Sequence, residues 1–142
     1  MIRYLSKISG PLLDRIDIHI EVTPVPFEKL TEIRNAESSV AIRQRVIRAR
    51  DIQTARFESL EHIHYNAQMG TKLIREFCAL NETSLQLLKT AMERLNLSAR
   101  AFDRILKVAR TIADLEASPT VHSNHIAEAI QYRSLDREGW LG

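Results

Sequence analysis

The sequence predicts a mainly α-helical protein with one β-strand close to its N-terminus. Residues 16–22 alternate apolar and polar side chains, as a strand with one buried face does. After a linker at residues 23–26, the chain contains few glycines and is rich in helix-forming residues. Apolar side chains in that part recur three and four positions apart, which is typical of amphipathic helices. These observations predict a helical region that follows a single strand.

The composition indicates one globular unit. The 142 residues are 44% apolar and 27% charged, which suits one domain with a substantial core. No apolar stretch approaches the roughly 20 residues of a membrane span, and no secretory segment follows Met1, so we expect a cytoplasmic protein with no membrane partner. The single cysteine, Cys78, lies in an apolar run and is expected to be a buried, inert thiol.

A tight turn before the strand presents an arginine. Gly10 and Pro11 form the turn, and Arg15 directly precedes the strand. A guanidinium group is planar and permanently charged, which suits contact with a phosphate held by another subunit or ligand. On the residues alone, the simpler interpretation is a surface arginine paired with Asp14 or Asp17.

The linker at residues 23–26 predicts a boundary near residue 25. Its Thr-Pro-Val-Pro sequence cannot continue a helix or donate regularly to a sheet. We therefore divide the chain into the turn and strand (1–25), a basic helix with a connecting segment (26–69) and a helical region (70–142). Because an unpaired apolar strand edge is adhesive, we expect the strand to dock on the helices or to pair with another copy of the chain.

The first predicted helix, about residues 36–59, is strongly basic. Between Arg34 and Arg56 there are six arginines and two acids, a local balance of +4. Its narrow apolar face consists of Ile42, Val46, Ala49 and Gln53. The candidate contacts to DNA or to another subunit are Arg43, Arg45, Arg48 and Arg50, with a plain solvated surface as the third interpretation. The helix lacks interleaved aromatic side chains, so base stacking is not expected.

Two short helices are predicted after a looser stretch at residues 60–69. That stretch carries His62 and His64, but no carboxylate or cysteine is arranged to complete a site, so we expect no bound metal. Thr71 is predicted to cap a helix that reaches about residue 80, and Asn81 to cap the next one over 82–95. The expected core stripe of the second helix consists of Leu85, Leu88, Met92 and Leu95.

The most strongly patterned helix begins at Ser98, a predicted N-cap, and ends by Ser118. Its predicted buried face consists of Phe102, Ile105, Leu106, Ala109, Ile112 and Ala113. Arg100 falls in the first turn, where free N–H groups and the helix dipole favour an anion, although a solvated arginine is the simpler interpretation. Away from the apolar stripe we expect two surface rows, Arg100 with Arg104 and Lys107, and Asp103 with Arg110 and Asp114.

The last predicted helix covers about residues 123–134. It is expected to bury Ile126, Ala129 and Ile130. The only tryptophan, Trp140, lies in the tail and is expected to dock the end of the chain; the sequence assigns it no function.

Four segments together resemble one protein family. They are SGPLLDRIDIHIEV (9–22), ESSVAIRQRVIRARDIQTAR (37–56), SARAFDRILKVARTIADL (98–115) and HIAEAIQYRSLD (125–136). In this order they resemble the C-terminal region of magnesium-chelatase-like AAA+ ATPases, the ComM or YifB group. The resemblance implies the helical lid domain of such an ATPase, preceded by the last β-strand of its α/β nucleotide-binding core.

The resemblance also implies roles for two arginines. Arg15 corresponds to an arginine finger that acts in trans on the γ-phosphate of a neighbour's ATP, and Arg100 to the sensor-2 residue that contacts the nucleotide of its own subunit. The sequence contains no Gly-x-x-x-x-Gly-Lys-Ser/Thr phosphate loop and no Asp-Glu pair that ends an apolar strand. ATP and Mg²⁺ are therefore expected as cofactors of a full-length protein, and this chain alone is expected to be inactive.

Full-length relatives are expected to form rings, with hexamers as the expected size, that remodel a partner. For the ComM or YifB group the implied partner is DNA, in helicase-like or competence-related work. A first alternative is the motor subunit of a true magnesium chelatase, which drives Mg²⁺ insertion into a porphyrin. A second alternative is a stand-alone helical module that binds DNA or protein through the basic helix and never contacts ATP.

Overall fold

The structure is a computed structural model that describes residues 12, 15–20, 22–27 and 36–133. Its helices are α4 (Ser39–Arg56), the 3₁₀-helix η1 (Asn66–Gln68), α5 (Thr71–Phe77), α6 (Glu82–Arg94), α7 (Ala99–Leu115) and α8 (Ser123–Gln131). The predicted mainly α-helical class is therefore confirmed. Trp140 and the end of the predicted last helix lie outside the described residues.

The prediction of a strand at residues 16–22 is wrong for the described part of this segment. None of residues 15–20 or 22 is in a strand. A strand needs a neighbouring strand to accept and donate its backbone hydrogen bonds, and no other strand occurs among the described residues. The alternating pattern remains as exposed apolar side chains, with Ile20 69% and Val22 84% exposed.

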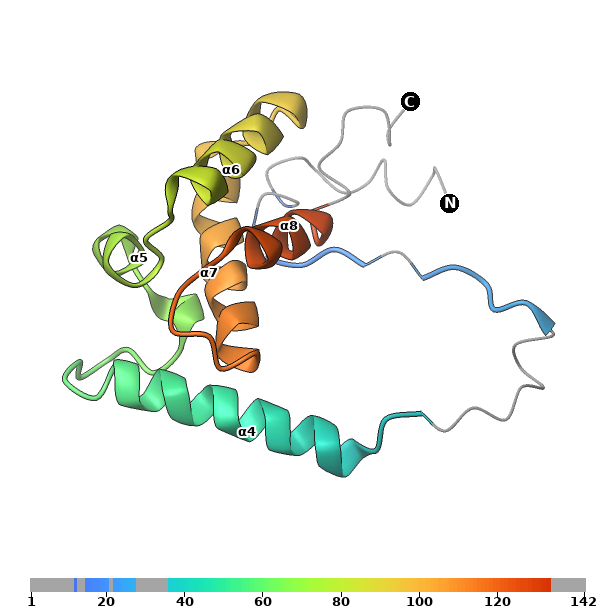
Figure 1. Cartoon of the computed structure of the whole chain (residues 1–142), viewed down its shortest axis with the longest axis horizontal. Coiled ribbons are helices and arrows are strands. Elements are labelled where there is room, and N and C mark those ends of the chain that lie inside the picture. The colour runs from blue at the N-terminus through green and yellow to red at the C-terminus, as the bar shows by residue number, and fades with distance from the viewer. Residues whose placement is uncertain (1–11, 13–14, 21, 28–35, 134–142) are drawn as a thin grey trace.

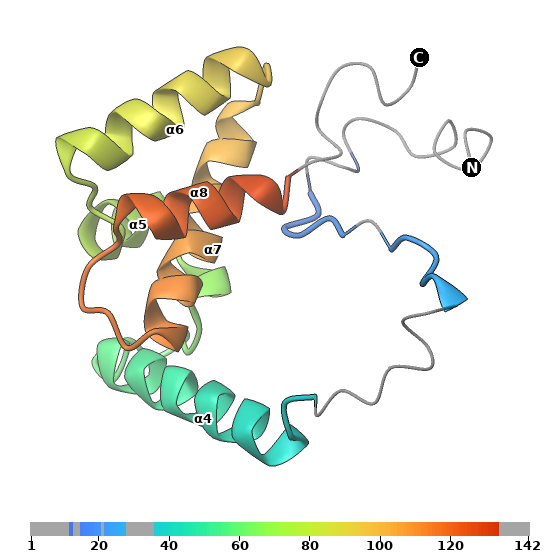
Figure 2. The same cartoon turned by 45° about the vertical axis from the view of Figure 1, so that its right-hand side comes forward.

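The core is built around α7. In both views α7 runs through the middle of the bundle, and α4 lies across the end at which α7 finishes (Figures 1 and 2). α8 packs against both α7 and α6. Ile105 and Ala109 of α7, Ile126 of α8 and Leu88 of α6 have no exposed surface. The apolar face predicted for residues 98–115 is confirmed, with Phe102 only partly buried.

Side-chain caps start two of the helices as the sequence predicts. Asn81 accepts a hydrogen bond from the Ser84 N–H at 2.8 Å, and Ser98 accepts one from the Ala101 N–H at 3.2 Å. Each cap satisfies one of the N–H groups that a first helical turn leaves without a partner. Thr71 is not a cap: the N-cap is Gly70, and Thr71 is the first helical residue.

α7 ends earlier than the Ser118-Pro119 sequence suggests. The last helical residue is Leu115, and Ala117 has a left-handed φ of 55°. The Ser118 N–H donates to the Ala113 backbone oxygen at 2.8 Å, and the Ala117 N–H donates to the Asp114 backbone oxygen at 3.0 Å. These two bonds form a Schellman motif, which terminates a helix without glycine at some cost in backbone strain.

The predicted apolar face of the first helix is only half buried. Ala49 and Gln53 are buried, whereas Ile42 is 41% and Val46 43% exposed. The N-terminal half of α4 extends beyond the bundle in both views, so no described element covers it (Figures 1 and 2). Even α4, the longest described helix, lacks the apolar character of a membrane span, as do the shorter described helices.

Candidate functional site

Arg15 lies exposed on a turn. Its N–H donates to the Leu12 oxygen at 3.0 Å, which closes the turn. Asp17, one of two acids considered as its partner, instead pairs with Arg104 of α7. Asp14, the other, lies outside the described residues. Arg15 is therefore an exposed residue at the end of a hydrogen-bonded turn.

The residues that follow Arg15 dock on α7 and on the end of α8. The Arg133 guanidinium donates to the Ile16 oxygen, and the His19 N–H donates to the Tyr132 oxygen at 2.7 Å. His19 is only 6% exposed. Of the two outcomes expected for residues 16–22, docking on the helices is confirmed for residues 16–19, whereas Ile20 and Val22 are exposed. No regularity in the sequence indicated which residues would hold the segment.

Arg100 lies exposed in the first turn of α7, as predicted. The Ser98 hydroxyl satisfies only the Ala101 N–H, so the other N–H groups of that turn keep the partial positive charge of a helix start. The next two basic residues on this side are already engaged. Arg104 pairs with Asp17, and the Lys107 ammonium donates to the Ala67 oxygen at 2.9 Å. Arg104 and Lys107 therefore make contacts within the fold and are not plain surface charges.

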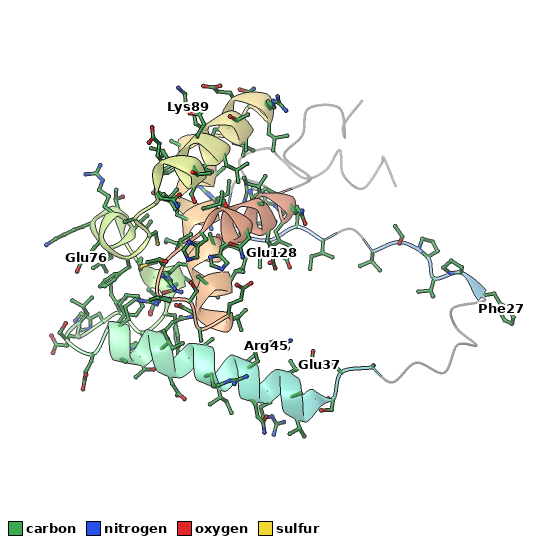
Figure 3. All side chains as sticks on the ribbon, in the orientation of Figure 1. Phe27, Glu37, Arg45, Glu76, Lys89 and Glu128 are labelled. Carbon is green, nitrogen blue, oxygen red and sulfur yellow. The ribbon has the colours of Figure 1, made fainter. Side chains whose placement is uncertain are left out.

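The four candidate arginines of α4 differ in their surroundings. Arg45 pairs with Glu37 at 2.6 Å near the N-terminal end of the helix (Figure 3), and both side chains are 44% exposed. The Arg50 guanidinium lies 5.3 Å from the centre of the Tyr65 ring. Arg43 and Arg48 are exposed. Two of the four are thus oriented by neighbours, and two are presented to solvent.

A buried ionic cluster joins α4 to α7. Asp114 accepts hydrogen bonds from Arg56 of α4, one of them at 2.7 Å, and from Arg110 one turn earlier in α7 at 3.1 Å. The Asp114 side chain is fully buried, and those of Arg110 and Arg56 are 2% and 12% exposed. The prediction that Arg110 and Asp114 belong to a surface row is therefore wrong, because α4 covers that side of α7.

Neutral side chains complete this ionic cluster. Asn66 of η1 donates to Asp114 at 2.7 Å and to Thr111 at 3.1 Å, and accepts from Arg56 at 2.8 Å. Arg110 also donates to the backbone oxygens of Ser118 and Pro119 at 2.5 and 2.9 Å. Burial lowers the pKa of the Arg110 guanidinium, and the neighbouring Asp114 opposes this shift. The cluster fixes the connection to α8 as well as the position of α4.

Other candidate chemical groups have structural surroundings. Cys78 is buried as predicted, and that burial raises the pKa of its thiol to about 11, so very little thiolate exists at neutral pH. His62 and His64 are exposed. Within the described ranges, no group of three or more histidine, cysteine or acidic side chains is arranged around a point that could hold a metal.

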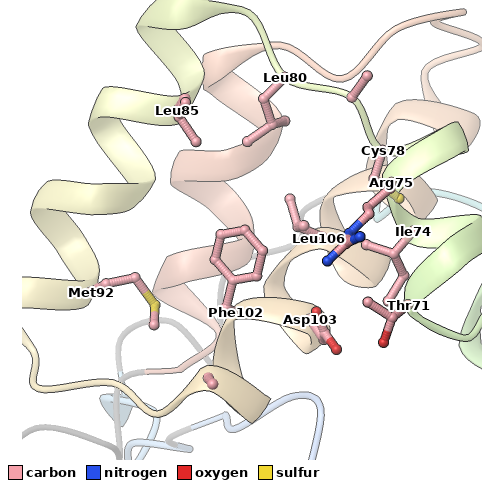
Figure 4. Close-up of a pocket in the computed structure, with 12 residues that line it drawn as sticks. Thr71, Ile74, Arg75, Cys78, Leu80, Leu85, Met92, Phe102, Asp103 and Leu106 are labelled. Atoms are coloured by element: carbon pink, nitrogen blue, oxygen red, sulfur yellow. The ribbon is translucent and has the colours of Figure 1, made fainter.

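A groove of about 670 Å³ lies between α5, α6 and α7 (Figure 4). Its walls are mainly apolar, with Arg75 and Asp103 as charged members of the lining. Leu85 is 51% exposed in this groove, so its prediction as a core residue is wrong. The physical reason is that α5 and α7 do not close over the first turn of α6.

Comparisons with known proteins agree on one family. Residues 36–133 match the family described as "Magnesium chelatase, subunit ChlI C-terminal", and residues 1–30 match "Magnesium chelatase, subunit ChlI". Competence protein ComM of Haemophilus influenzae is 40% identical over 138 residues, which are 96% of this chain and 26% of that protein. YifB of Escherichia coli is 40% identical over 137 residues, again 96% of this chain and 26% of the relative.

YifB of Salmonella typhimurium is 38% identical over 137 residues, with the same coverage of 96% and 26%. The chain thus spans about a quarter of the length of the curated relatives that it matches. Both parts of the family description are found in the expected order along the chain. The chain belongs to the magnesium-chelatase-like ComM/YifB family and matches its C-terminal region.

Proposed function

We propose that this chain is the helical lid region of an AAA+ ATPase, where it supplies two arginines to ATP hydrolysis. The observation that carries the proposal is the exposed Arg15 on a closed turn, directly before a segment that is bound at Ile16, Asp17 and His19. An arginine on such a support can be presented to a neighbouring subunit with little loss of conformational entropy. Membership of the magnesium-chelatase-like family supports the same assignment.

Arg15 acts in trans on the γ-phosphate of ATP held by the next subunit. Phosphoryl transfer depends mainly on positioning and on stabilising charge that is spread over the transferred phosphoryl oxygens. The planar guanidinium donates two parallel hydrogen bonds to such oxygens. Water around an exposed Arg15 is displaced only when two subunits meet, so hydrolysis depends on assembly.

Arg100 acts on the nucleotide of its own subunit. The first turn of α7 directs backbone N–H groups and the positive end of its dipole toward solvent, and the guanidinium adds further donors for phosphate. Ser98 holds the start of this helix, so the position of Arg100 depends little on the rest of the exposed surface. α7 is also the centre of the core, which makes it a rigid support.

ATP and Mg²⁺ are bound by residues that this sequence does not contain. A phosphate loop and a metal-holding acid pair are absent from it, so the two arginines fit the phosphate oxygens but not the metal. Bound Mg²⁺ would supply positive charge that offsets the charge developing on the transferred phosphoryl group. We accordingly propose that this chain alone is inactive and that the full-length protein hydrolyses ATP.

The proposed assembly is a closed ring of copies, because a finger that acts in trans requires a neighbour at every site. The expected number of copies is six, as the family resemblance implies. DNA is the proposed partner of the ring. The name of the relative ComM describes a competence protein, which supports work on DNA. Motor function in magnesium chelation is the alternative, and the family descriptions support it by name.

We expect Arg100→Ala in the full-length protein to raise the Kd for ATP about 10- to 100-fold. Hydrogen bonds to a charged group contribute about 1.5–3 kcal/mol, and each 1.4 kcal/mol is tenfold in affinity. Titration with a fluorescent ATP analogue measures the Kd. Lys89→Ala, which removes an exposed cation from α6, is the matched control (Figure 3). An unchanged Kd for Arg100→Ala contradicts the proposed role.

The projecting half of α4 is proposed to contact protein rather than DNA. Its arginines are interleaved with exposed aliphatic side chains, among them Val40 at 65% and Ile47 at 49% exposed, which give a phosphate backbone nothing to bind. Arg45 and Arg50 already have neighbours on this chain. A contact with another subunit or with the nucleotide-binding core uses both the apolar and the charged groups.

This chain alone is therefore expected to bind duplex DNA weakly. Arg43 and Arg48 are the two exposed arginines of α4 for which the described residues show no ion pair or ring contact. Binding through these two groups gives a slope of log K against log[salt] no steeper than about −2, since each phosphate contact contributes about −0.9. Fluorescence anisotropy at salt concentrations from about 50 to about 200 mM measures the slope. Tight binding with a slope beyond about −4 that Arg43→Ala and Arg48→Ala reduce supports the stand-alone DNA-binding module instead.

A further inference from the structure

We propose that residues 16–19 form a mechanical link that couples the position of α7 to the presentation of Arg15. This inference rests on the proposed function, because it connects Arg100, the proposed contact to a subunit's own nucleotide, with Arg15, which is proposed to act on the nucleotide of a neighbouring subunit. Through this link, a change in the orientation of α7 on nucleotide binding alters the Arg15 turn. The link makes Arg104, Asp17 and Arg133 positioning residues for hydrolysis.

The first contact of the link lies on α7 itself. Arg104 pairs with Asp17. Arg104 lies four residues after Arg100, which is about 6 Å along a helix, and on the same side of it. Asp17 lies two residues after Arg15, a chain length of at most about 7 Å. One ion pair therefore joins the two proposed nucleotide contacts over very few covalent bonds.

The second set of contacts lies just beyond the end of α8. Arg133 has no exposed surface, and its guanidinium donates to the Ile16 oxygen, next to Arg15 in the chain. The Tyr132 backbone oxygen accepts a hydrogen bond from the His19 backbone N–H at 2.7 Å. The backbone of the link is therefore held on both sides of Asp17 by groups that are fixed to the core.

Two side chains of the link, Asp17 and Ile18, lie beside the helices without being buried there. Asp17 and Ile18 line a cavity of about 310 Å³ together with Val108 and Ile112 of α7 and Tyr132. A four-residue segment that is held at three of its residues, Ile16, Asp17 and His19, cannot absorb a rotation of α7 within itself. The displacement must pass to the turn at Arg15, which precedes the first held residue.

The exposure of the contacts indicates which of them can respond. The Arg104 and Asp17 side chains are 28% and 46% exposed, so solvent weakens their attraction. Arg133 and His19, by contrast, are buried. The buried contacts keep the link docked, while the half-exposed ion pair transmits the position of α7 and can form or break with the nucleotide state.

The link itself is tested by hydrogen exchange in this 142-residue chain, because the His19 amide reports docking directly. We expect Asp17→Arg and Arg104→Asp each to accelerate exchange of that amide about five- to tenfold. The double variant, which restores opposite charges in exchanged positions, is expected to return the rate to within about twofold of the original.

Lys89→Asp on the exposed face of α6 is the matched charge reversal and is expected to leave the exchange rate unchanged. Asp17→Asn supplies a milder variant if a reversal prevents folding, which the helical circular dichroism signal reports. Unchanged exchange in Asp17→Asn and in both reversals overturns the proposed link, and so does a double variant that exchanges as fast as the single ones.

The coupling is tested in the full-length protein through ATP hydrolysis. We expect Arg104→Asp to lower kcat about tenfold with KM within about twofold, because it displaces a group that acts in the transition state, and the double variant to recover kcat. If Arg15→Ala silences hydrolysis but Arg104→Asp does not change kcat, the coupling is wrong and the proposed function stands. If Arg15→Ala changes nothing, both are overturned.

Discussion

We expect Arg15→Ala in the full-length protein to lower kcat for ATP hydrolysis about 10³- to 10⁵-fold and to leave the Kd for ATP nearly unchanged. The expected size is that of an arginine supplied to a transferring phosphoryl group. Affinity is expected to be preserved because the proposed finger stabilises charge that develops in the transition state rather than the bound ground state. Steady-state phosphate release measures kcat, and equilibrium titration with a non-hydrolysable ATP analogue measures binding.

Two comparisons separate catalysis by Arg15 from an effect on assembly. Arg15→Lys keeps one positive charge but loses the two parallel donors, so we expect it to recover only a small part of the activity. Mixing an excess of Arg15→Ala subunits with unmodified ones is expected to lower the activity of the unmodified sites, because in the proposed ring each site receives its finger from a neighbour. Hydrolysis at the original rate in the alanine variant contradicts a role in trans.

Asp114→Asn lowers the free energy of unfolding of this chain by about 3–5 kcal/mol. The change removes the counter-charge of two largely buried guanidinium groups, Arg56 and Arg110, and breaking one side of a buried ion pair costs about this amount. Small domains are stabilised by only about 5–15 kcal/mol in total, so the loss is severe. Urea unfolding, followed by the helical circular dichroism signal at about 222 nm, measures the free energy of unfolding.

Glu37→Gln is the matched control for this stability prediction. It removes a carboxylate from an arginine in the same way, but the Arg45–Glu37 pair is 44% exposed on each side. Exposed pairs contribute about 0–1 kcal/mol, so we expect little change in the unfolding midpoint. Equal losses in Asp114→Asn and Glu37→Gln contradict the view that burial makes the Asp114 cluster essential.

Local patterns were sufficient to predict most helices. The stripe on residues 98–115 combines an apolar period near 3.6 with an N-cap at Ser98, and both signals depend only on nearby residues. The same is true of Asn81 and α6. The exposed Arg100 followed from its place in the first turn of that helix. Its proposed role, like that of Arg15, came from the family resemblance and not from these patterns.

Predictions failed where a distant element decides what covers a residue. Arg110 and Asp114 look like surface charges until α4 packs over them, and Ile42 looks buried although α4 extends past the bundle. Arg56 seemed one more cation on a basic helix, yet it reaches Asp114, which is 58 positions away in the chain. No periodicity within one helix contains that information.

By itself, the sequence determined the helical class, the starts of α6 and α7 and the exposed positions of the two arginines, because caps, apolar period and turn residues act within a few positions of the chain. Only the tertiary structure decided that residues 16–19 are held by Arg104, Tyr132 and Arg133, and that a buried ionic cluster joins α4 to α7. Such contacts unite groups from segments that are far apart in the sequence, so they exist only after those segments have packed together.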